Sequence, residues 1–260
     1  MARTLGQIFR LPAEQALTTM YSEDILDLLS NISDINTRHV QEQILPFLFS
    51  SLPDRAPPRM ASTQRLQYWR NLSALSKLCV QPELFETMVE RLLIKLDLIC
   101  MPKSMTVVAD SEPELAAAYA HSILIAFVIA LETKVKLKHL DIPKYIDRLV
   151  FPLFNFFVYS SIGPENMVAT NSRVIKAAGR IVTLVVQTLP IQYVTIAFEP
   201  APAILNHLRR QKSFTIALFS AYTSGIFNGI AEGIHVIPAD ATFKPFEVAT
   251  HDLRGVQVLI

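Results

Sequence analysis

Residues 41–100 of the chain read QEQILPFLFSSLPDRAPPRMASTQRLQYWRNLSALSKLCVQPELFETMVERLLIKLDLIC. Prolines divide this stretch into three segments, each with the apolar spacing of an amphipathic helix. The second segment begins at Ser62, and its large apolar residues recur every three positions, at Leu66, Trp69, Leu72, Leu75 and Leu78. The third begins at Pro82, a residue favoured in the first turn of a helix, and carries a wide apolar stripe from Leu84 to Leu96. Trp69 lies in the middle of its stripe, so we expect it to be a core residue.

The first segment has a second copy 106 positions later. Residues 44–49 (ILPFLF) and residues 150–155 (VFPLFN) share the form apolar-apolar-Pro-apolar-apolar-X. Each copy is followed by a loop and a second amphipathic helix, as in HEAT repeats of about 40–47 residues. Residues 173–180 (RVIKAAGR) also resemble the second helix of a HEAT repeat. Since such helix pairs bury their faces by stacking, the sequence predicts an all-α fold, a right-handed α-solenoid of HEAT-like helix pairs.

The predicted helical domain covers residues 1–233, and residues 234–260 have no regular period, so we expect an irregular C-terminal tail there. Pro46 falls inside its helix, where it removes a backbone hydrogen bond and bends the axis. Further helices are expected at residues 115–131, 143–157, 172–185, 203–212 and 213–227. Between them we expect a basic connecting loop at Lys134, Lys136 and Lys138 and a linker at residues 160–171. Thr37 is the expected cap of its helix, and Ser111 with Glu114 has the spacing of a capping box.

The composition excludes several classes of protein. Hydrophobic residues make up 51% of the 260 positions and charged residues 18%, below the usual ~25%, and the mean hydropathy is +0.32. The net charge of +1 gives no electrostatic argument for nucleic-acid binding. Two cysteines, Cys79 and Cys100, cannot form a disulfide framework or supply the four thiolates that an iron–sulfur cluster usually takes. A reducing compartment is therefore expected, and we expect no secretory or transit signal.

No group of residues points to catalysis. The chain has no G-x-S-x-G, P-loop or H-E-x-x-H motif. We therefore assign no catalytic, cofactor-binding or metal-binding residue, and we expect no cofactor. Cys79, Cys100 and His121 are interpreted as packing residues. The six histidines are scattered: His39, His121, His139, His207, His235 and His251.

A few polar groups leave room for partner binding. Asp54 and Arg55 are interpreted as a turn held by a local ion pair, with a partner contact as the alternative. Basic clusters lie at Arg209, Arg210 and Lys212 and at the three lysines of the predicted basic loop. No aromatic residues alternate with these clusters, so solvated helix ends explain them at least as well as phosphate binding.

One pattern favours a different class, a helical membrane protein. Gly225, Gly229 and Gly233 form GxxxGxxxG in a segment whose first nineteen residues, 213–231, carry no charge. In lipid this would be a spanning helix with a dimerisation face. However, the segment is diluted by seven Ser, Thr, Tyr and Asn residues, and the helices before residue 100 are amphipathic. Membrane insertion is therefore the minor alternative.

Three motifs resemble a known family. LPDRAP at residues 52–57, LCVQPELFE at residues 78–86 and KLDLIC at residues 95–100 resemble the HEAT-repeat DNA repair and transcription proteins of the methyl-methanesulfonate-sensitivity-nineteen family, in their fungal form. Weaker similarity extends through residues 144–159 and 173–190. The members of this family are much longer, so the resemblance implies an internal portion of one, as a fragment, a truncated gene model or a divergent short paralogue. The motifs consist of packing and turn residues, and no functional residue is carried over from the family.

The resemblance implies a function that the residues alone do not. It implies a non-enzymatic adaptor of the cytosolic iron–sulfur protein assembly machinery, which delivers clusters to apo proteins of DNA repair, replication and transcription. The implied partners are the other assembly subunits and the apo client proteins, with no direct contact to nucleic acid or membrane, and the implied location is the cytoplasm and nucleus. The alternative is a generic HEAT-repeat scaffold with unrelated clients.

Overall fold

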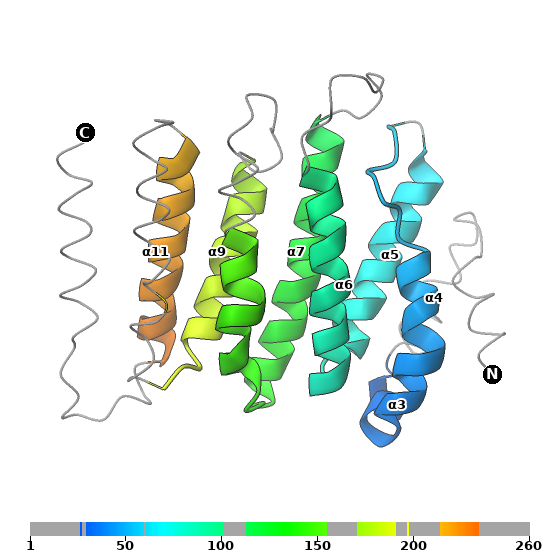
Figure 1. Ribbon diagram of the computed structural model, residues 1–260, viewed down its shortest axis with the longest axis horizontal. Helices are drawn as coiled ribbons and strands as arrows, with labels where there is room; N and C mark the ends of the chain where they lie inside the picture. The colour runs from blue at the N-terminus through cyan, green and yellow to red at the C-terminus, as the bar shows by residue number, and fades with distance from the viewer. Residues whose placement is uncertain are drawn as a thin grey trace. The chain divides into compact units, whose positions relative to one another are not determined.

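The computed structural model describes residues 30–59, 61–100, 113–154, 171–190 and 214–233, together with Asp27 and Ala197. Every regular element in this described part is helical (Figure 1). The all-α prediction is therefore confirmed for these residues. The chain divides into two compact units, residues 1–133 and residues 134–260.

The first unit contains four consecutive long or medium helices that lie side by side in Figure 1. These are α4 (Leu45–Ser50), α5 (Ser62–Leu78), α6 (Pro82–Cys100) and α7 (Pro113–Lys136), and α4 is preceded by the short helices α3 (Thr37–His39) and η1 (Val40–Ile44). The predicted starts of α5 at Ser62 and α6 at Pro82 are confirmed. The predicted cap of α3 is wrong: the Oδ1 atom of Asn36 accepts a hydrogen bond from the backbone N–H of His39 at 3.1 Å, and Thr37 is the first helical residue.

Both proline-containing helices adapt to their proline in the same way. A π-helical turn, η1, precedes Pro46, and a second π-helical turn, η3 (Ile146–Val150), precedes Pro152 by the same number of residues. Each π turn closes with an i→i−5 hydrogen bond, from Leu45 to Val40 and from Phe151 to Ile146. A π turn widens the helix where the proline ring would otherwise meet the carbonyl four residues earlier. The sequence repeat is thus also a repeat of local structure.

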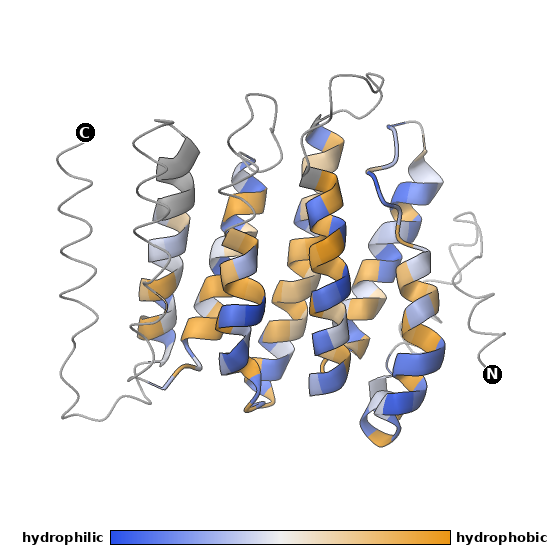
Figure 2. Cartoon of the chain, in the orientation of Figure 1, coloured by the Kyte–Doolittle hydropathy of each residue, from blue (hydrophilic) through white to orange (hydrophobic). Residues whose placement is uncertain are grey.

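The core of the first unit lies between these helices. The rings of Phe85 in α6 and Phe127 in α7 meet edge to face, with centroids 6.4 Å apart, and both side chains are fully buried. Figure 2 shows hydrophobic residues along the length of α6 and α7. Other fully buried residues of this core are Leu45, Leu48, Ala74, Leu75, Leu78, Leu84, Met88, Leu92 and Ile123.

The prediction that Trp69 is a core residue is wrong. Its side chain is 59% exposed, whereas Leu72, Leu75 and Leu78 of the same helix are buried. At 3.6 residues per turn, a step of three residues turns about 60° short of a full circle. The four steps from Leu66 to Leu78 therefore spread these residues over about two thirds of the helix circumference, so the pattern that includes Trp69 cannot define one buried face.

The expected basic loop at Lys134, Lys136 and Lys138 is also wrong in part. α7 continues to Lys136, and Lys134 is fully buried. The helix ends in a Schellman motif, because the N–H of His139 bonds to the carbonyl of Lys134 and the N–H of Lys138 bonds to that of Val135, both at 3.0 Å. Lys138 takes the left-handed position of this motif with φ = 56°.

The second unit has its helical core around α9 (Ser172–Val186) and α11 (Phe214–Gly233), which pack against one another. η2 (Ile142–Lys144) and η3 lie before them in the chain, and helix continues through residues 151–154. Asn171 caps α9 by accepting a hydrogen bond from the N–H of Arg173 at 3.0 Å. The rings of Phe154 and Tyr222 meet at 4.5 Å, and the Tyr222 hydroxyl donates to the carbonyl of Ala197.

The glycine stripe of α11 serves this packing. A Cβ atom at Gly225, Gly229 or Gly233 would lie 2.7 Å from an atom of α9 or of Gln187, the residue that follows it. These glycines therefore let two helices of the same chain approach closely, as small residues do at helix contacts. The pattern that suggested a dimerisation face in lipid is used inside the second unit.

Some predictions lie outside the described residues. These are the capping-box serine Ser111, most of the linker at 160–171, the helix at 203–212 with its basic cluster, and the tail at 234–260.

Candidate partner-binding surfaces

The loop between α4 and α5 is held in place by two other helices. The Lys95 ammonium of α6 donates to the Leu52 carbonyl at 3.1 Å and forms an ion pair with Asp54. The Tyr119 hydroxyl of α7 donates to the Pro53 carbonyl at 2.8 Å. The expected local ion pair between Asp54 and Arg55 is therefore wrong, because Asp54 pairs with a residue 41 positions later.

Two tyrosines join α5 to α7 beneath this loop. The rings of Tyr68 and Tyr119 lie 4.5 Å apart. Burial raises the pKa of both phenols, and for Tyr68 the charge of Arg65 and a hydrogen bond with Ser122 oppose this rise in pKa. Both hydroxyls therefore stay protonated at neutral pH, as a hydroxyl that donates to a carbonyl must.

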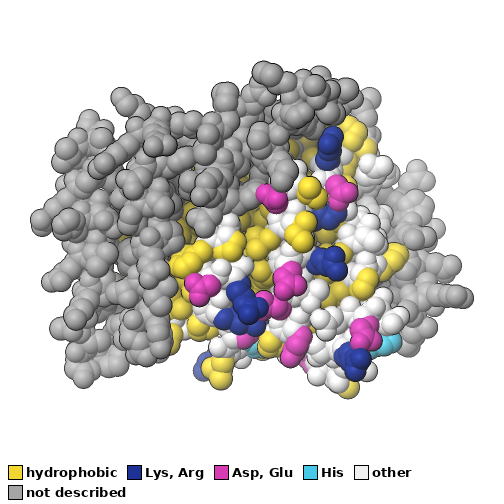
Figure 3. Space-filling view, in the orientation of Figure 1, with side chains coloured by type: hydrophobic (Ala, Val, Ile, Leu, Met, Phe, Trp, Pro, Cys, Tyr) yellow, Lys and Arg dark blue, Asp and Glu magenta, His cyan; other side chains and the backbone are white. Residues whose placement is uncertain are grey.

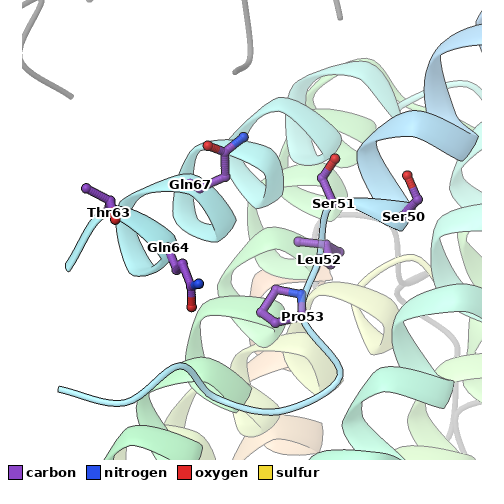
Figure 4. Close-up of a pocket in the computed structure, with 7 residues that line it drawn as sticks. All are labelled: Ser50, Ser51, Leu52, Pro53, Thr63, Gln64 and Gln67. Atoms are coloured by element: carbon purple, nitrogen blue, oxygen red, sulfur yellow. The ribbon is translucent and has the colours of Figure 1, made fainter. Parts of the chain in front are cut away.

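A polar pocket of about 380 Å³ opens beside the loop (Figure 4). Thr63, Gln64 and Gln67 come from the start of α5, and Ser50 and Ser51 come from the end of α4 and the turn after it. Its walls carry hydroxyl and amide groups and no charged side chain among the described residues. Such a wall can exchange hydrogen bonds with a partner but supplies no acid, base or nucleophile pair.

The exposed face of α5 combines an aromatic residue with cations. Arg65 precedes Trp69 by one helical turn, so the two share a face, and Arg70 follows Trp69 directly. α5 contains no Asp or Glu. Neither arginine forms an ion pair with a residue in the described part of the chain. Trp and Arg are the residue types most enriched at the energetic centres of protein interfaces.

A second surface is a groove of about 490 Å³ between α4 and α6. We call it the α4–α6 groove. Ile94 of α6 is 58% exposed at its edge, and Leu98, one turn further, is 45% exposed. These two residues lie outside the predicted apolar stripe, on the same helix as charged residues such as Arg91. Their position in the sequence therefore indicated that they are exposed. The groove is lined by Gln41, Leu45, Pro46, Phe49, Ser50, Thr87, Arg91, Ile94 and Lys95.

A buried polar cluster, which was not predicted, lies where α7 ends. The Lys134 ammonium lies 2.8 Å from Oδ2 of Asp141 and 3.3 Å from Nδ1 of His139. Because an ammonium only donates, Nδ1 of His139 accepts and its proton is on Nε2. Tyr145 donates its hydroxyl to Asp141 at 3.2 Å. All four residues belong to the second unit, and the contact with Asp141 neutralises the buried lysine there.

The remaining candidates for a metal-binding or catalytic site are the histidines, the cysteines and the acidic residues. Among the described residues, no group of three or more His, Cys, Asp and Glu is placed to hold a metal ion. His39 is exposed and His121 half-buried, and His207, His235 and His251 lie outside the described residues. Cys79 is fully buried, and burial raises the pKa of its thiol. It is therefore a packing residue, as predicted, and the side chain of Cys100 is not among those described.

One described helix, residues 114–136 of α7, is long and apolar enough to cross a membrane. In the structure 56% of its most apolar window is buried. A buried core helix has the same composition as a spanning one, so this feature gives weak evidence for a membrane.

Much of this helical chain matches the model of a known protein family. A family model described as RNAPII transcription regulator C-terminal (MMS19_C) matches residues 71–224. The match begins within α5, includes α6, α7 and α9, and ends within α11. Comparison with curated proteins and with solved structures gave no significant match.

Proposed function

Because the chain belongs to the RNAPII transcription regulator C-terminal family (MMS19_C), we propose that it is a non-enzymatic scaffold that acts in DNA repair and transcription. In the finer form of this proposal, it is an adaptor of cytosolic iron–sulfur protein assembly. It brings the assembly machinery to apo proteins of DNA repair, replication and transcription. The cluster is the cargo of this reaction and is not a cofactor of the chain.

The family match over residues 71–224 is the observation that carries this proposal. It is supported by two exposed surfaces within or beside the matched range, the Trp69 face of α5 and the α4–α6 groove. An adaptor needs surfaces of this kind, where exposed aromatic, aliphatic and Arg side chains meet a partner. The resemblance of residues 52–57, 78–86 and 95–100 to the same family supports the iron–sulfur assignment.

We further propose that the helices form a right-handed α-solenoid of HEAT-like pairs. The repeated unit of π turn and proline at Pro46 and Pro152 supports a repeat architecture, because the local structure recurs together with the sequence. A solenoid offers a long surface built from many separate contacts, which suits a protein that binds several partners.

The partners in this proposal are the other assembly subunits and apo iron–sulfur clients, in the cytoplasm and the nucleus. Protein contacts suffice for this role, and nucleic acid and membrane take no direct part. The net charge of +1 is consistent with a protein whose partners are proteins.

The test is iron incorporation in cells of the organism that carries the gene. The gene is deleted, the cells are labelled with radioactive iron, and an iron–sulfur helicase and a mitochondrial iron–sulfur enzyme are immunoprecipitated. We expect the helicase to lose most of its label and the mitochondrial enzyme to keep it. Full label on the helicase would contradict the iron–sulfur proposal and favour the generic scaffold.

Variants show whether the α5 surface takes part. Trp69→Ala in the restored gene is expected to lower helicase labelling, because it removes the exposed aromatic side chain without touching the core. Glu83→Gln, at an exposed position of α6 outside the polar pocket and the α4–α6 groove, is the control and is expected to restore labelling fully.

A further inference from the structure

We infer that the α4–α6 groove binds an extended peptide segment of a partner protein in which an apolar side chain is followed, two residues later, by Asp or Glu. The inference rests on the proposed function only in that an adaptor has protein partners. It specifies one place of contact and the chemistry of the segment that fits it.

The groove has the size and lining for one or two apolar side chains. Its volume of about 490 Å³ lies in the range of ligand sites. Leu45 and Phe49 of α4 lie buried along it, and Ile94 of α6 leaves more than half of its side chain exposed at the edge. Burial of this isoleucine by a partner would be favourable at ~25 cal/mol per Å².

The two walls are joined at one end of the groove. Nε2 of Gln41 in η1 donates to Oγ1 of Thr87 in α6 at 3.1 Å. This bond fixes the start of the proline-containing helix against α6, so the groove is formed before a partner arrives. A preformed site spares a short peptide part of the cost of ordering the protein.

The charged side chains that line the groove are cationic, and one of them, Lys95, already pairs with Asp54. The described charged residues that line it are Arg91 and Lys95, both cations one helical turn apart on α6. Arg91 is exposed and forms no ion pair with any described residue. Figure 3 shows hydrophobic side chains on this face of the molecule, with cationic and acidic side chains among them. A segment with a carboxylate next to an apolar residue complements both features.

The chain itself contains an example of this recognition. In the loop after α4, Leu52 is buried and Asp54, two residues later, pairs with Lys95. The same ammonium also donates a hydrogen bond to the Leu52 carbonyl at 3.1 Å. α6 thus already binds one apolar-x-acidic segment through a cation and a backbone contact. Arg91, one turn before Lys95, and Ile94, directly before it, offer a second cation and an exposed apolar side chain on the same helix, and Arg adds a planar fork suited to carboxylates.

Fluorescence anisotropy of the whole chain with three labelled probe peptides tests the inference. The peptides carry a central Phe-Ser-Asp, Phe-Ser-Lys or Ala-Ser-Asp sequence in the same Gly/Ser context. We expect saturable binding of the Phe-Ser-Asp peptide, with about tenfold weaker binding of each of the other two, the loss expected for one charge-assisted contact or one buried aromatic ring.

Variants locate the binding. Arg91→Glu is expected to reverse the preference, so that the Phe-Ser-Lys peptide binds more tightly than the Phe-Ser-Asp peptide. Ile94→Ser is expected to weaken both, and Glu90→Gln, an exposed residue beside the groove residues, is the control that leaves binding unchanged. Since Arg91, Ile94 and Glu90 are all exposed, the variants are expected to fold, which circular dichroism checks.

Three results would overturn the inference: no binding of the Phe-Ser-Asp peptide, equal binding of the Asp and Lys peptides, or a preference that Arg91→Glu leaves unchanged. The outcome is separate from that of the iron-labelling experiment. If the peptide results hold while deletion of the gene leaves helicase labelling intact, the groove stands and the iron–sulfur proposal fails.

Discussion

Gly225 of α11 lies so close to α9 that a Cβ atom in its place would come within 2.7 Å of the Gly179 carbonyl oxygen and 2.9 Å of the Val182 Cβ atom. Both atoms belong to the rigid parts of α9, so neither can move aside cheaply. The contact explains why a long helix of the second unit contains glycine at positions where alanine would favour helix by ~1 kcal/mol.

We therefore expect Gly225→Ala to lower the free energy of unfolding by about 1–3 kcal/mol, the usual cost of overpacking a core. Ser224→Ala, at the exposed neighbouring position, is the matched control and is expected to change it by less than about 0.5 kcal/mol. Urea titration followed by circular dichroism measures both. A Gly225→Ala variant as stable as the parent chain would show that the two helices are not in close contact.

Trp69 and Leu75 lie on the same helix but differ in exposure, 59% against 0%. Truncation of Trp69 to alanine is expected to change the free energy of unfolding by less than about 1 kcal/mol. Truncation of Leu75 removes a fully buried side chain and is expected to cost about 2–5 kcal/mol. Denaturant titration of both variants checks the order, and a cost for Trp69→Ala that equals the cost for Leu75→Ala would refute the exposed position of Trp69.

The buried ion pair of Lys134 and Asp141 predicts a specific pattern of stability in single and double variants. Asp141→Asn leaves an uncompensated ammonium with no exposure to water, so we expect a loss of about 3–5 kcal/mol in stability. The double variant Lys134→Met with Asp141→Asn removes that charge and is expected to recover much of the loss. Thermal unfolding of the single and double variants measures this coupling. Additive losses would mean that the two groups do not interact, and exposed Lys136→Met serves as the neutral control.

Lys138 holds a backbone conformation that glycine adopts more easily. With φ = 56° at the end of α7, its Cβ is crowded in a way that glycine avoids. Lys138→Gly is expected to raise the unfolding free energy by about 0.5–1 kcal/mol, after the larger entropy of glycine in the unfolded chain is deducted. Lys136→Gly, two residues earlier and inside the helix, is expected to lower it by ~1 kcal/mol. Two changes of the same sign would contradict the assigned end of α7.

The sequence predicted that the fold is all-α. It also predicted the first residue of a helix where neighbouring residues determine that position. Ser62 and Pro82 begin their helices because a proline-rich loop and a proline in the first turn leave few alternatives. The repeat around Pro46 and Pro152 was visible in sequence, but the π turns were not, because they depend on how each helix relieves the clash of its proline with the preceding turn.

The errors arose where a short pattern had to decide which face of a helix is buried. At Lys134 the alternating lysines suggested a loop, but the residue continues the buried face of α7, three, four and seven positions after Leu131, Ala130 and Phe127. A lysine is placed there because Asp141 and His139, from the following turn, neutralise it, and a contact made by the turn cannot be read from helix periodicity. The prediction for Trp69 was wrong for a different reason, because residues spaced three apart do not follow a single face of a helix.

The candidate surfaces were the least predictable part. The position of Ile94 and Leu98 outside the apolar stripe indicated exposure, but only the structure shows that the described part of the chain leaves them 58% and 45% exposed. The family resemblance, by contrast, came from loop and packing motifs and agrees with the family model over residues 71–224. The family could therefore be predicted from the sequence, whereas the candidate binding surfaces could not.

The most direct test of the adaptor proposal is binding of the purified chain to the purified subunits of the cytosolic iron–sulfur assembly machinery of the same organism, measured by biolayer interferometry. We predict saturable binding to at least one subunit, weakened by Trp69→Ala or Arg91→Glu and unchanged by Glu83→Gln. A folded chain that binds none of these subunits, alone or combined, would contradict the proposal.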